Sequence, residues 1–455
     1  MTIILKMMLK IEIRTTGREI FLLFSPPFSI FRAMKYAVFN FIQRFLRKYT
    51  ICSCVLFISI FISSCSLKTH SIEDPTSENN EKDSVSVEVK EKHAEVVAPG
   101  AYTMRKYLSS LRNKRVGIVA NPGSLVKGAH IVDTLLARMI DIQKIYSPEH
   151  GFRGKADAGE IIEHGCDIKT GIEIVSLYGK NRKPNAEQLA GIDVMVFYLQ
   201  DVGVRFYTYI STLTYVMEAC AENNIPLIVL DCPNPNGDYI DGPILQPKNR
   251  SFIGLHPVPV VYGMTIGEYA LMVNGEKWIS TECELTVIPC VNYTHESSYH
   301  LPVNPSPNLR SDTAIAWYPS LCFFEGTVAS VGRGTPTPFE VVGHPLYPSH
   351  NFMFIPLPDE GAKNPLLNGQ VCYGMDFRKE MPERKLVIKP LIDFYQNFPD
   401  TVNFFLNNGF FELLAGTDSL RQQIMRCENE ETIRATWQEG LDKFKAMREN
   451  YLLYP

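Results

Sequence analysis

Three acidic residues stand just after short apolar runs of this 455-residue chain. Glu149 follows the second run, Asp201 the third and Asp231 the fourth, each close to glycine or proline. Carboxyl groups that meet at one site can give protons to a bound molecule or take them from it, so the pattern points to acid–base chemistry. Each acid taken alone is equally well explained as a turn former or a helix cap. The three together favour a shared site.

The elements that must position these acids are predicted to be buried parallel strands. Continuous Val, Ile and Leu, rather than alternation with polar residues, is typical of strands covered on both faces. The four runs are 116–120, 142–146, 194–199 and 226–230. Amphipathic helical patterns between them predict a doubly wound, Rossmann-like α/β sheet that is mostly parallel. Ligands bind outside the carboxyl ends of such strands, where the acids would converge.

Composition and missing motifs exclude several other functions. Lys and Arg total 45 against 49 Asp and Glu, a net charge of −4, which argues against a nucleic-acid partner. The chain has neither dinucleotide fingerprint nor P-loop, and no G-x-S-x-G of a serine hydrolase. Its eleven cysteines include no C-x-x-C pair, and the histidines near Glu149 have no familiar metal spacing. We therefore expect no cofactor and no metal.

The N-terminal segment has the pattern of an export signal. From Met34, a plausible true start, the chain reads basic, then apolar over 51–62, then Ser-Ser-Cys65. The apolar run is shorter than the roughly 20 residues that span a bilayer, although a single anchoring helix is the alternative. The ending resembles a bacterial lipobox, which implies that Cys65 carries a lipid and that 1–65 is a signal peptide. Residues 66–100 are polar and predict a flexible tether.

Two folded parts should follow the tether. The first, 101–320, is expected to be the Rossmann-like domain that carries Glu149 and Asp201, and the second, 321–455, has a smaller α+β pattern. Strand-like runs of the second part lie at 328–331, 370–373 and 385–388. Helical patterns follow at 391–397, 419–427 and 430–448. In the last of these, apolar residues recur at steps of three and four, so one helix face should be buried.

Eight short strings, in order along the chain, carry a resemblance to a known family. The first is Ser147-Pro148-Glu149-His150-Gly151-Phe152-Arg153-Gly154. The others are SLYGK from 176, QDVG from 200, RFYTY from 205, DCPNP from 231, PSPN from 305, FEGT from 324 and GRGT from 332. Together they closely resemble the NamZ-type exo-β-N-acetylmuramidases of bacterial cell-wall recycling. The resemblance implies a glycoside hydrolase that removes N-acetylmuramic acid from the non-reducing end of peptidoglycan fragments, in a cleft between the two domains.

Such hydrolysis usually takes two carboxyl groups, one to protonate the leaving oxygen and one to activate water or attack the sugar. Glu149, rigidly held between Pro148 and the His150-Gly151 turn, is the first candidate for the acid. Either Asp201 or Glu325, the latter in the family-like FEGT string, could be its partner. The acetamido oxygen of the substrate could also replace an enzymic nucleophile.

Substrate-binding residues are expected in the same strings. Arginine recognises a carboxylate bidentately, so at least one arginine is expected to hold the lactyl group of muramic acid, and Arg333 and Arg153 are preferred to Arg205. Pairing with nearby acids is the alternative for each. The remaining candidates are aromatic or polar residues that suit sugar rings, although they also suit a core or a turn: His150, Tyr178, Tyr207, Asn234 and Asn308.

Two classes of function remain at this stage. One is a lipid-anchored exo-muramidase of the cell envelope, periplasmic or on the outer membrane, acting on muramyl saccharides. The other is a non-catalytic envelope lipoprotein that binds sugars or wall fragments through the same cleft.

Overall fold

The computed structural model describes residues 15–16, 19–20, 96–149, 151–153 and 165–455. Contacts divide the chain into two units, Met1–Lys90 and Glu91–Pro455. In the first unit the described residues form one antiparallel pair, β1 (Thr15–Thr16) and β2 (Glu19–Ile20). The predicted signal, Cys65 and most of the predicted tether lie outside the described residues. Within the described part, no helix is both long and apolar enough to cross a bilayer.

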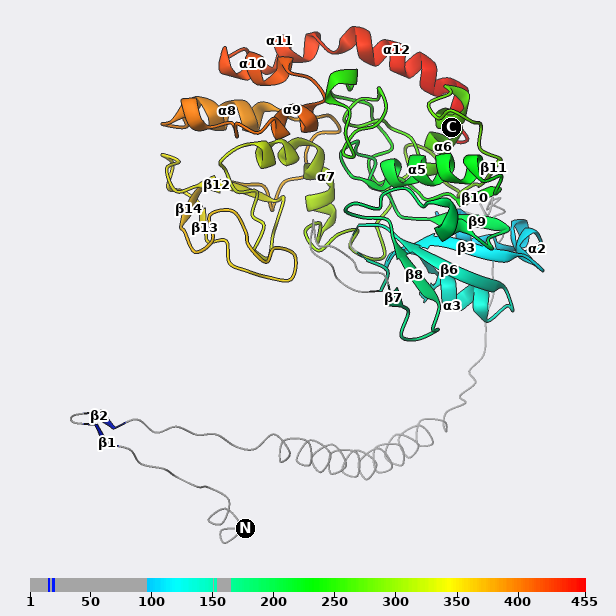
Figure 1. Cartoon of the computed structure of the whole chain (residues 1–455). Helices are drawn as coiled ribbons and strands as arrows, with labels where there is room; N and C mark the ends of the chain where they lie inside the picture. The colour runs from blue at the N-terminus through cyan, green and yellow to red at the C-terminus, as the bar shows by residue number, and fades with distance from the viewer. Residues whose placement is uncertain (1–14, 17–18, 21–95, 150, 154–164) are drawn as a thin grey trace, which may run out of the picture. The chain divides into compact units, whose positions relative to one another are not determined.

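The second unit is built on a seven-stranded sheet of order β11-β10-β9-β3-β6-β8-β7 (Figure 1). Every neighbouring pair is parallel except β7 and β8. The predicted mostly parallel α/β sheet is therefore confirmed. The strands are β3 (Arg115–Ala120), β6 (Asp141–Ser147), β7 (Gly165–Cys166), β8 (Glu173–Ser176), β9 (Val194–Tyr198), β10 (Leu227–Leu230) and β11 (Leu285–Ile288). A small hairpin, β4 (Leu125–Val126) and β5 (Ala129–His130), follows β3.

Burial on both faces explains the continuous apolar runs. In β9, Val194, Val196 and Tyr198 enter one core, whereas Met195 and Phe197 enter the other. Helices α5 and α6 lie on one side of the sheet and α3 on the other (Figure 1). The helices of this part are α2 (Leu108–Leu111), α3 (Ile131–Leu136), α4 (Ala186–Leu189), α5 (Tyr209–Glu222) and α6 (Ile266–Gly275).

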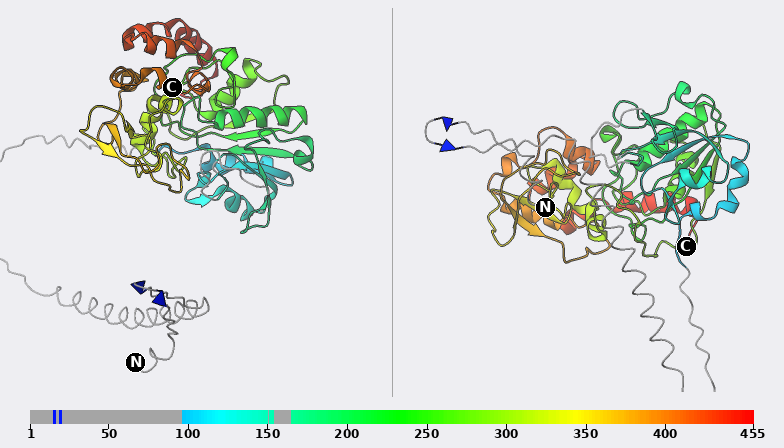
Figure 2. Two further views of the ribbon diagram at one scale, coloured as in Figure 1. Left: turned by 60° about the vertical axis from the view of Figure 1, so that its left-hand side comes forward. Right: turned by 90° about the horizontal axis from the view of Figure 1, so that it is seen from below.

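The C-terminal elements form a smaller assembly beside the sheet (Figure 2). Its antiparallel sheet has the order β12-β14-β13, from β12 (Val341–His344), β13 (Met353–Phe354) and β14 (Cys372–Asp376). Helix α7 (Asp312–Leu321) leads into it, and the predicted division at residue 320 falls inside this helix. The later helices are α8 (Lys389–Asn397), α9 (Phe410–Ala415), α10 (Ser419–Met425), α11 (Glu430–Ala435) and α12 (Gln438–Arg448).

Three expectations for this part were wrong in detail. Residues 328–331 and 385–388 are not strands, although Ser330 forms an isolated bridge with Gly343. The apolar side chains of these segments fill the core without joining a strand ladder. The single helix expected over 430–448 is divided into α11 and α12. Single-turn 3₁₀ helices complete the chain: Gly100–Tyr102, Met104–Lys106, Pro247–Asn249, Cys322–Gly326, Thr401–Asn403 and Glu449–Tyr451.

The last residues of the chain return to the carboxyl edge of the sheet. The Tyr454 hydroxyl donates to Asp231 Oδ2 at 2.5 Å, and the Leu453 N–H donates to Glu268 Oε1 at 2.8 Å. Asp231 also accepts hydrogen bonds from the Thr265 hydroxyl and the Gly267 N–H. Burial raises the pKa of this carboxyl to about 7. Asp231 was expected to join the other acids at the site, but the structure uses it to hold the C-terminus.

Candidate active site

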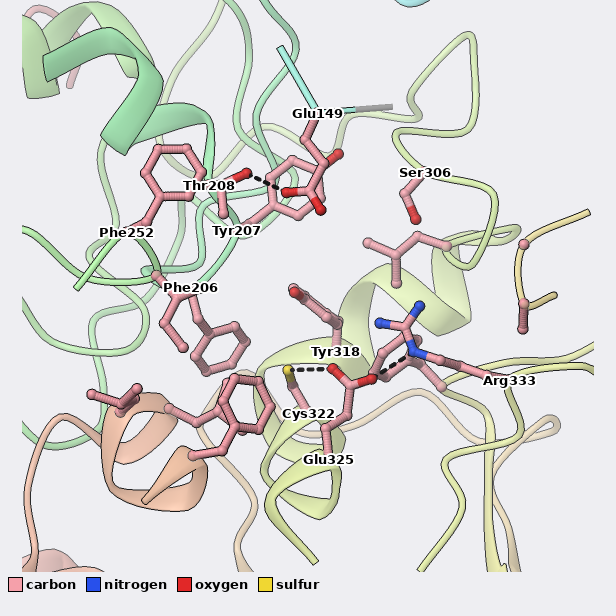
Figure 3. Close-up of a pocket in the computed structure, with 18 of the residues that line it drawn as sticks. Glu149, Phe206, Tyr207, Thr208, Phe252, Ser306, Tyr318, Cys322, Glu325 and Arg333 are labelled. Atoms are coloured by element: carbon pink, nitrogen blue, oxygen red, sulfur yellow. Dashed lines mark hydrogen bonds and ion pairs between the residues drawn. The ribbon is translucent and has the colours of Figure 1, made fainter. Parts of the chain in front are cut away.

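A cavity of about 610 Å³ lies where the loops at the carboxyl edge of the sheet meet α7, α9 and the 3₁₀ helix Cys322–Gly326 (Figure 3). Glu149 reaches it from the loop after β6, and Glu325 reaches it from the 3₁₀ helix. Aromatic and aliphatic side chains make up much of the remaining wall. The carboxyl groups of Glu149 and Glu325 are thus brought to one cavity from segments 176 residues apart in sequence (325 − 149).

The Glu149 carboxyl group is tied to the start of α5. Its Oε2 accepts a hydrogen bond of 2.9 Å from the hydroxyl of Thr208, the residue that precedes the helix. Figure 3 shows this bond and the Glu149 side chain directed toward the cavity. Thr208 therefore fixes the orientation of the first candidate for the acid.

The Glu325 carboxyl group has a different environment. Its Oε1 accepts from Arg333 Nε at 2.5 Å, and its Oε2 accepts from the Cys322 thiol at 3.5 Å (Figure 3). Burial raises the pKa of the Cys322 thiol well above its usual value, so this group stays protonated and serves as a donor. Arg333 also lies over the ring of Phe339, 5.1 Å from its centroid. The Glu325 carboxyl group is thus matched by a guanidinium, and the Glu149 carboxyl group accepts a hydrogen bond from a hydroxyl.

Asp201 does not reach the cavity. Its side chain is buried, and its Oδ2 accepts from the Gly203 N–H at 2.8 Å and from the Tyr262 hydroxyl. Among the residues that the structure describes, its Oδ1 has no hydrogen-bond partner. Burial raises the pKa of this carboxyl to about 6. Of the two expected partners of Glu149, the structure brings only Glu325 to the same cavity.

The raised pKa of Asp201 predicts a pH dependence of stability. The folded state holds the proton of the Asp201 carboxyl more tightly than the unfolded chain does. The contribution of this proton to the free energy of unfolding is therefore complete below about pH 4 and is lost as the pH rises through about 6. The stability of the wild type relative to an Asp201→Asn variant should fall by up to about 3 kcal/mol between pH 4 and pH 7. Urea unfolding of both proteins at several pH values measures this difference. Parallel pH profiles would contradict it, and exposed Asp442→Asn serves as the control.

Two of the three predicted arginines do not line this cavity and have structural partners in the fold. Arg205 is fully buried and donates to the carbonyl oxygens of Pro243, Val258 and Leu414 at 2.8 to 3.0 Å. Arg153 pairs with Asp133 and Asp167 and lines a second cavity, of about 580 Å³. Arg153 is therefore paired with nearby acids, which was the alternative to substrate binding. The partners of Arg205 are buried carbonyl oxygens and not acids.

The other predicted binding residues divide in the same way. Tyr178 and Tyr207 line the cavity, and the Tyr207 hydroxyl donates to the Pro305 carbonyl at 2.6 Å. Asn234 and Asn308 are buried in the fold, where their amides donate to the carbonyl oxygens of Met264 and Gly361. The amides of these two asparagines thus join segments that lie far apart in the sequence. His150 lies outside the described residues.

Sequence reasoning missed several residues of the cavity. Thr208 and Cys322, which bond to the two glutamates, stand inside or beside strings that had been noticed, but nothing in those strings marked them out. Arg182 and Phe252 stand in plain loops without any motif. Only the packing of distant segments brings these four side chains together.

A doubly wound sheet with two glutamates in an aromatic-walled cavity at its carboxyl edge defines an α/β protein suited to acid–base hydrolysis. Comparison with known proteins makes the class specific. The N-terminal and C-terminal models of exo-β-N-acetylmuramidase NamZ match residues 116–313 and 316–454. The chain therefore belongs to the NamZ exo-β-N-acetylmuramidase family, which confirms the resemblance seen in the eight strings.

One curated relative and two solved structures are similar over most of the chain. Peptidoglycan β-N-acetylmuramidase NamZ of Bacillus subtilis strain 168 is 36% identical over 370 residues, which cover 76% of this chain and 89% of the relative. Two DUF1343 family proteins of Bacteroides fragilis NCTC 9343 have TM-scores of 0.74 and 0.69, at 43% and 27% identity. Each alignment covers 79% of this chain and 99% of the solved chain.

Proposed function

We propose that this protein is an exo-acting glycoside hydrolase that releases N-acetylmuramic acid from the non-reducing end of peptidoglycan fragments. The observation that carries the proposal is the match to the family over 116–454, together with 36% identity to a peptidoglycan β-N-acetylmuramidase. The cavity supports it, because cleavage of a sugar linkage usually takes two carboxyl groups and aromatic walls suit the apolar faces of a sugar ring. A purely sugar-binding lipoprotein would have no need of the paired carboxyl groups.

In the proposed mechanism Glu149 protonates the oxygen of the leaving sugar. The Thr208 hydroxyl helps to hold this carboxyl group in place, so that its proton can reach that oxygen. Glu325 then acts as the charged partner, which activates water or stabilises the positive charge that develops on the sugar ring. Arg333 and Cys322 hold this carboxylate in a fixed orientation, so that little reorganisation is needed during the reaction.

The direct test is release of nitrophenol from para-nitrophenyl N-acetylmuraminide by the chain that starts after residue 65. Hydrolysis of this glycoside supports the proposal. Binding of the glycoside without release of nitrophenol would favour the sugar-binding lipoprotein instead.

We propose further that the mature protein is held in the cell envelope by a lipid on Cys65. The support is the sequence alone: a basic start, an apolar run and a lipobox-like ending. Metabolic labelling with radioactive palmitate should mark the full-length protein in cells and leave a Cys65→Ala variant unlabelled. Equal labelling of the two proteins would contradict the assignment.

A further inference from the structure

Arg182 is a cationic side chain of the cavity that has no acidic partner within the described residues. It stands in the loop between β8 and α4, where it is exposed to solvent and lines the cavity. The contact that the structure records for it is with an aromatic ring: its Cζ lies 4.4 Å from the centroid of Phe252. Arg333, the other arginine of the cavity, is bonded to Glu325.

The ring under Arg182 is itself held in place. Phe252 stacks on Tyr215 of α5, with centroids 6.1 Å apart and ring planes 5° from parallel. A guanidinium that rests on an aromatic face is attracted to it without using its N–H groups. The N–H fork of Arg182 therefore remains available to a ligand, and the side chain is partly ordered before the ligand arrives.

The charges that line the cavity show what such a ligand should carry. The charged residues among the described lining are Glu149, Glu325, Arg182 and Arg333. The pair Glu325–Arg333 is internally balanced, so a carboxylate bound to Arg333 would lie beside Glu325 and be repelled by it. A carboxylate bound to Arg182 would meet no such repulsion from an acid in contact with that arginine.

The two arginines of the cavity are associated with different parts of its wall. In the view of Figure 3, Phe252 lies on the left of the cavity, whereas Glu325 and Arg333 lie lower and to the right. Phe252, on which Arg182 rests, and Arg333 therefore lie on different sides of the cavity in this view.

We propose that Arg182 is the specificity-determining residue of the cavity and that it binds the lactyl carboxylate of the muramic ring. This inference rests on the proposed function, because it names the part of the same substrate that Arg182 recognises. It replaces Arg153, Arg205 and Arg333, the arginines to which the sequence pointed, in that one role. Planar, bidentate binding of a carboxylate is what a guanidinium fork does best, so lysine is not an equivalent replacement.

The test compares para-nitrophenyl N-acetylmuraminide with the methyl ester of its lactyl group, using the wild type and an Arg182→Met variant. Methionine keeps an apolar stem on Phe252 and removes the charge.

For the acid substrate, kcat/KM should fall about ten- to a hundredfold in the Arg182→Met variant. For the ester, kcat/KM should change less than about twofold, because no charged hydrogen bond is lost. Arg182→Lys should recover only part of the loss. Lys180→Met removes a charge from the same loop outside the cavity and should leave both rates unchanged.

Two outcomes would overturn the assignment: an equal loss on acid and ester, which indicates a structural role, or no loss on either. Binding of free N-acetylmuramic acid and N-acetylglucosamine, measured by calorimetry, separates this inference from the proposed function. If the wild type fails to cleave the glycoside but binds the acidic sugar in an Arg182-dependent way, the inference stands and the enzymatic function fails. If binding of the two sugars is equal in the wild type, the inference fails whatever the rate of hydrolysis.

Discussion

A Glu149→Gln variant should hydrolyse a natural muramyl disaccharide fragment at least about a hundredfold more slowly than the wild type. The amide keeps the shape of the carboxyl group and can still accept the hydrogen bond of Thr208, so the loop after β6 should keep its conformation. It cannot donate a proton to the leaving oxygen. The loss should therefore appear in kcat, with little change in the affinity for the free sugar.

The size of the loss should depend on the leaving group. Nitrophenol leaves without much protonation, whereas the hydroxyl of a sugar does not, so the loss should be larger on a natural disaccharide fragment. Glu284→Gln, an exposed residue outside the cavity, is the matched control and should retain full activity. If folded Glu149→Gln cleaves both substrates at the wild-type rate, the acid is another group.

An Arg205→Met variant should be less stable than the wild type by more than about 3 kcal/mol. The guanidinium is fully buried, and burial lowers its pKa to about 9, so it is still protonated at neutral pH. Methionine would fill much of the space but would leave the carbonyl oxygens of Pro243 and Leu414 without the donor that Arg205 supplies, whereas the Val258 carbonyl keeps its hydrogen bond from the Leu245 N–H. A buried carbonyl oxygen that is left without a donor lowers the free energy of unfolding by more than the net contribution of an ordinary hydrogen bond.

Urea unfolding at pH 7 measures this loss, and exposed Arg112→Met is the control. The hydrogen bond to Leu414 joins the sheet part of the molecule to α9, which forms part of the cavity wall. The variant should therefore also raise KM at temperatures where it remains folded. A change in stability below about 1 kcal/mol would show that water or a neighbouring group replaces the guanidinium.

The central strands could be predicted from sequence because burial on both faces demands a continuous apolar run. Strands β3, β6, β9 and β10 meet that condition. Edge strand β11 does not, since Leu285 and Val287 are only half-buried and Thr286 is exposed, and it was not assigned. Helices α11 and α12 read as one helix because Ile433, Trp437, Leu441 and Phe444 stay buried on one side across the turn that separates them.

The site could be predicted only where a residue's place along a strand fixes its position. Glu149 follows β6 at the edge where ligands bind, and it does line the cavity. Asp201 follows β9 in the same way, but the Tyr262 hydroxyl reaches it from a segment about 60 residues away and closes it off. Arg205 and Arg333 stand in equally suggestive strings. Arg205 lies among backbone carbonyl groups, whereas Arg333 lies beside Glu325. Tertiary packing decides this difference.

The contacts of Leu453 and Tyr454 with Glu268 and Asp231 bear on how the molecule can be dissected. The family models divide near residue 315, yet Asp231 and Glu268 of the first part accept hydrogen bonds from Tyr454 and Leu453 of the second. A fragment that stops at the model boundary would leave two acidic groups of the sheet layer without those donors. Mapping activity by expressing the halves separately would consequently report on an incomplete protein, and point substitutions in the intact chain are the sounder tool.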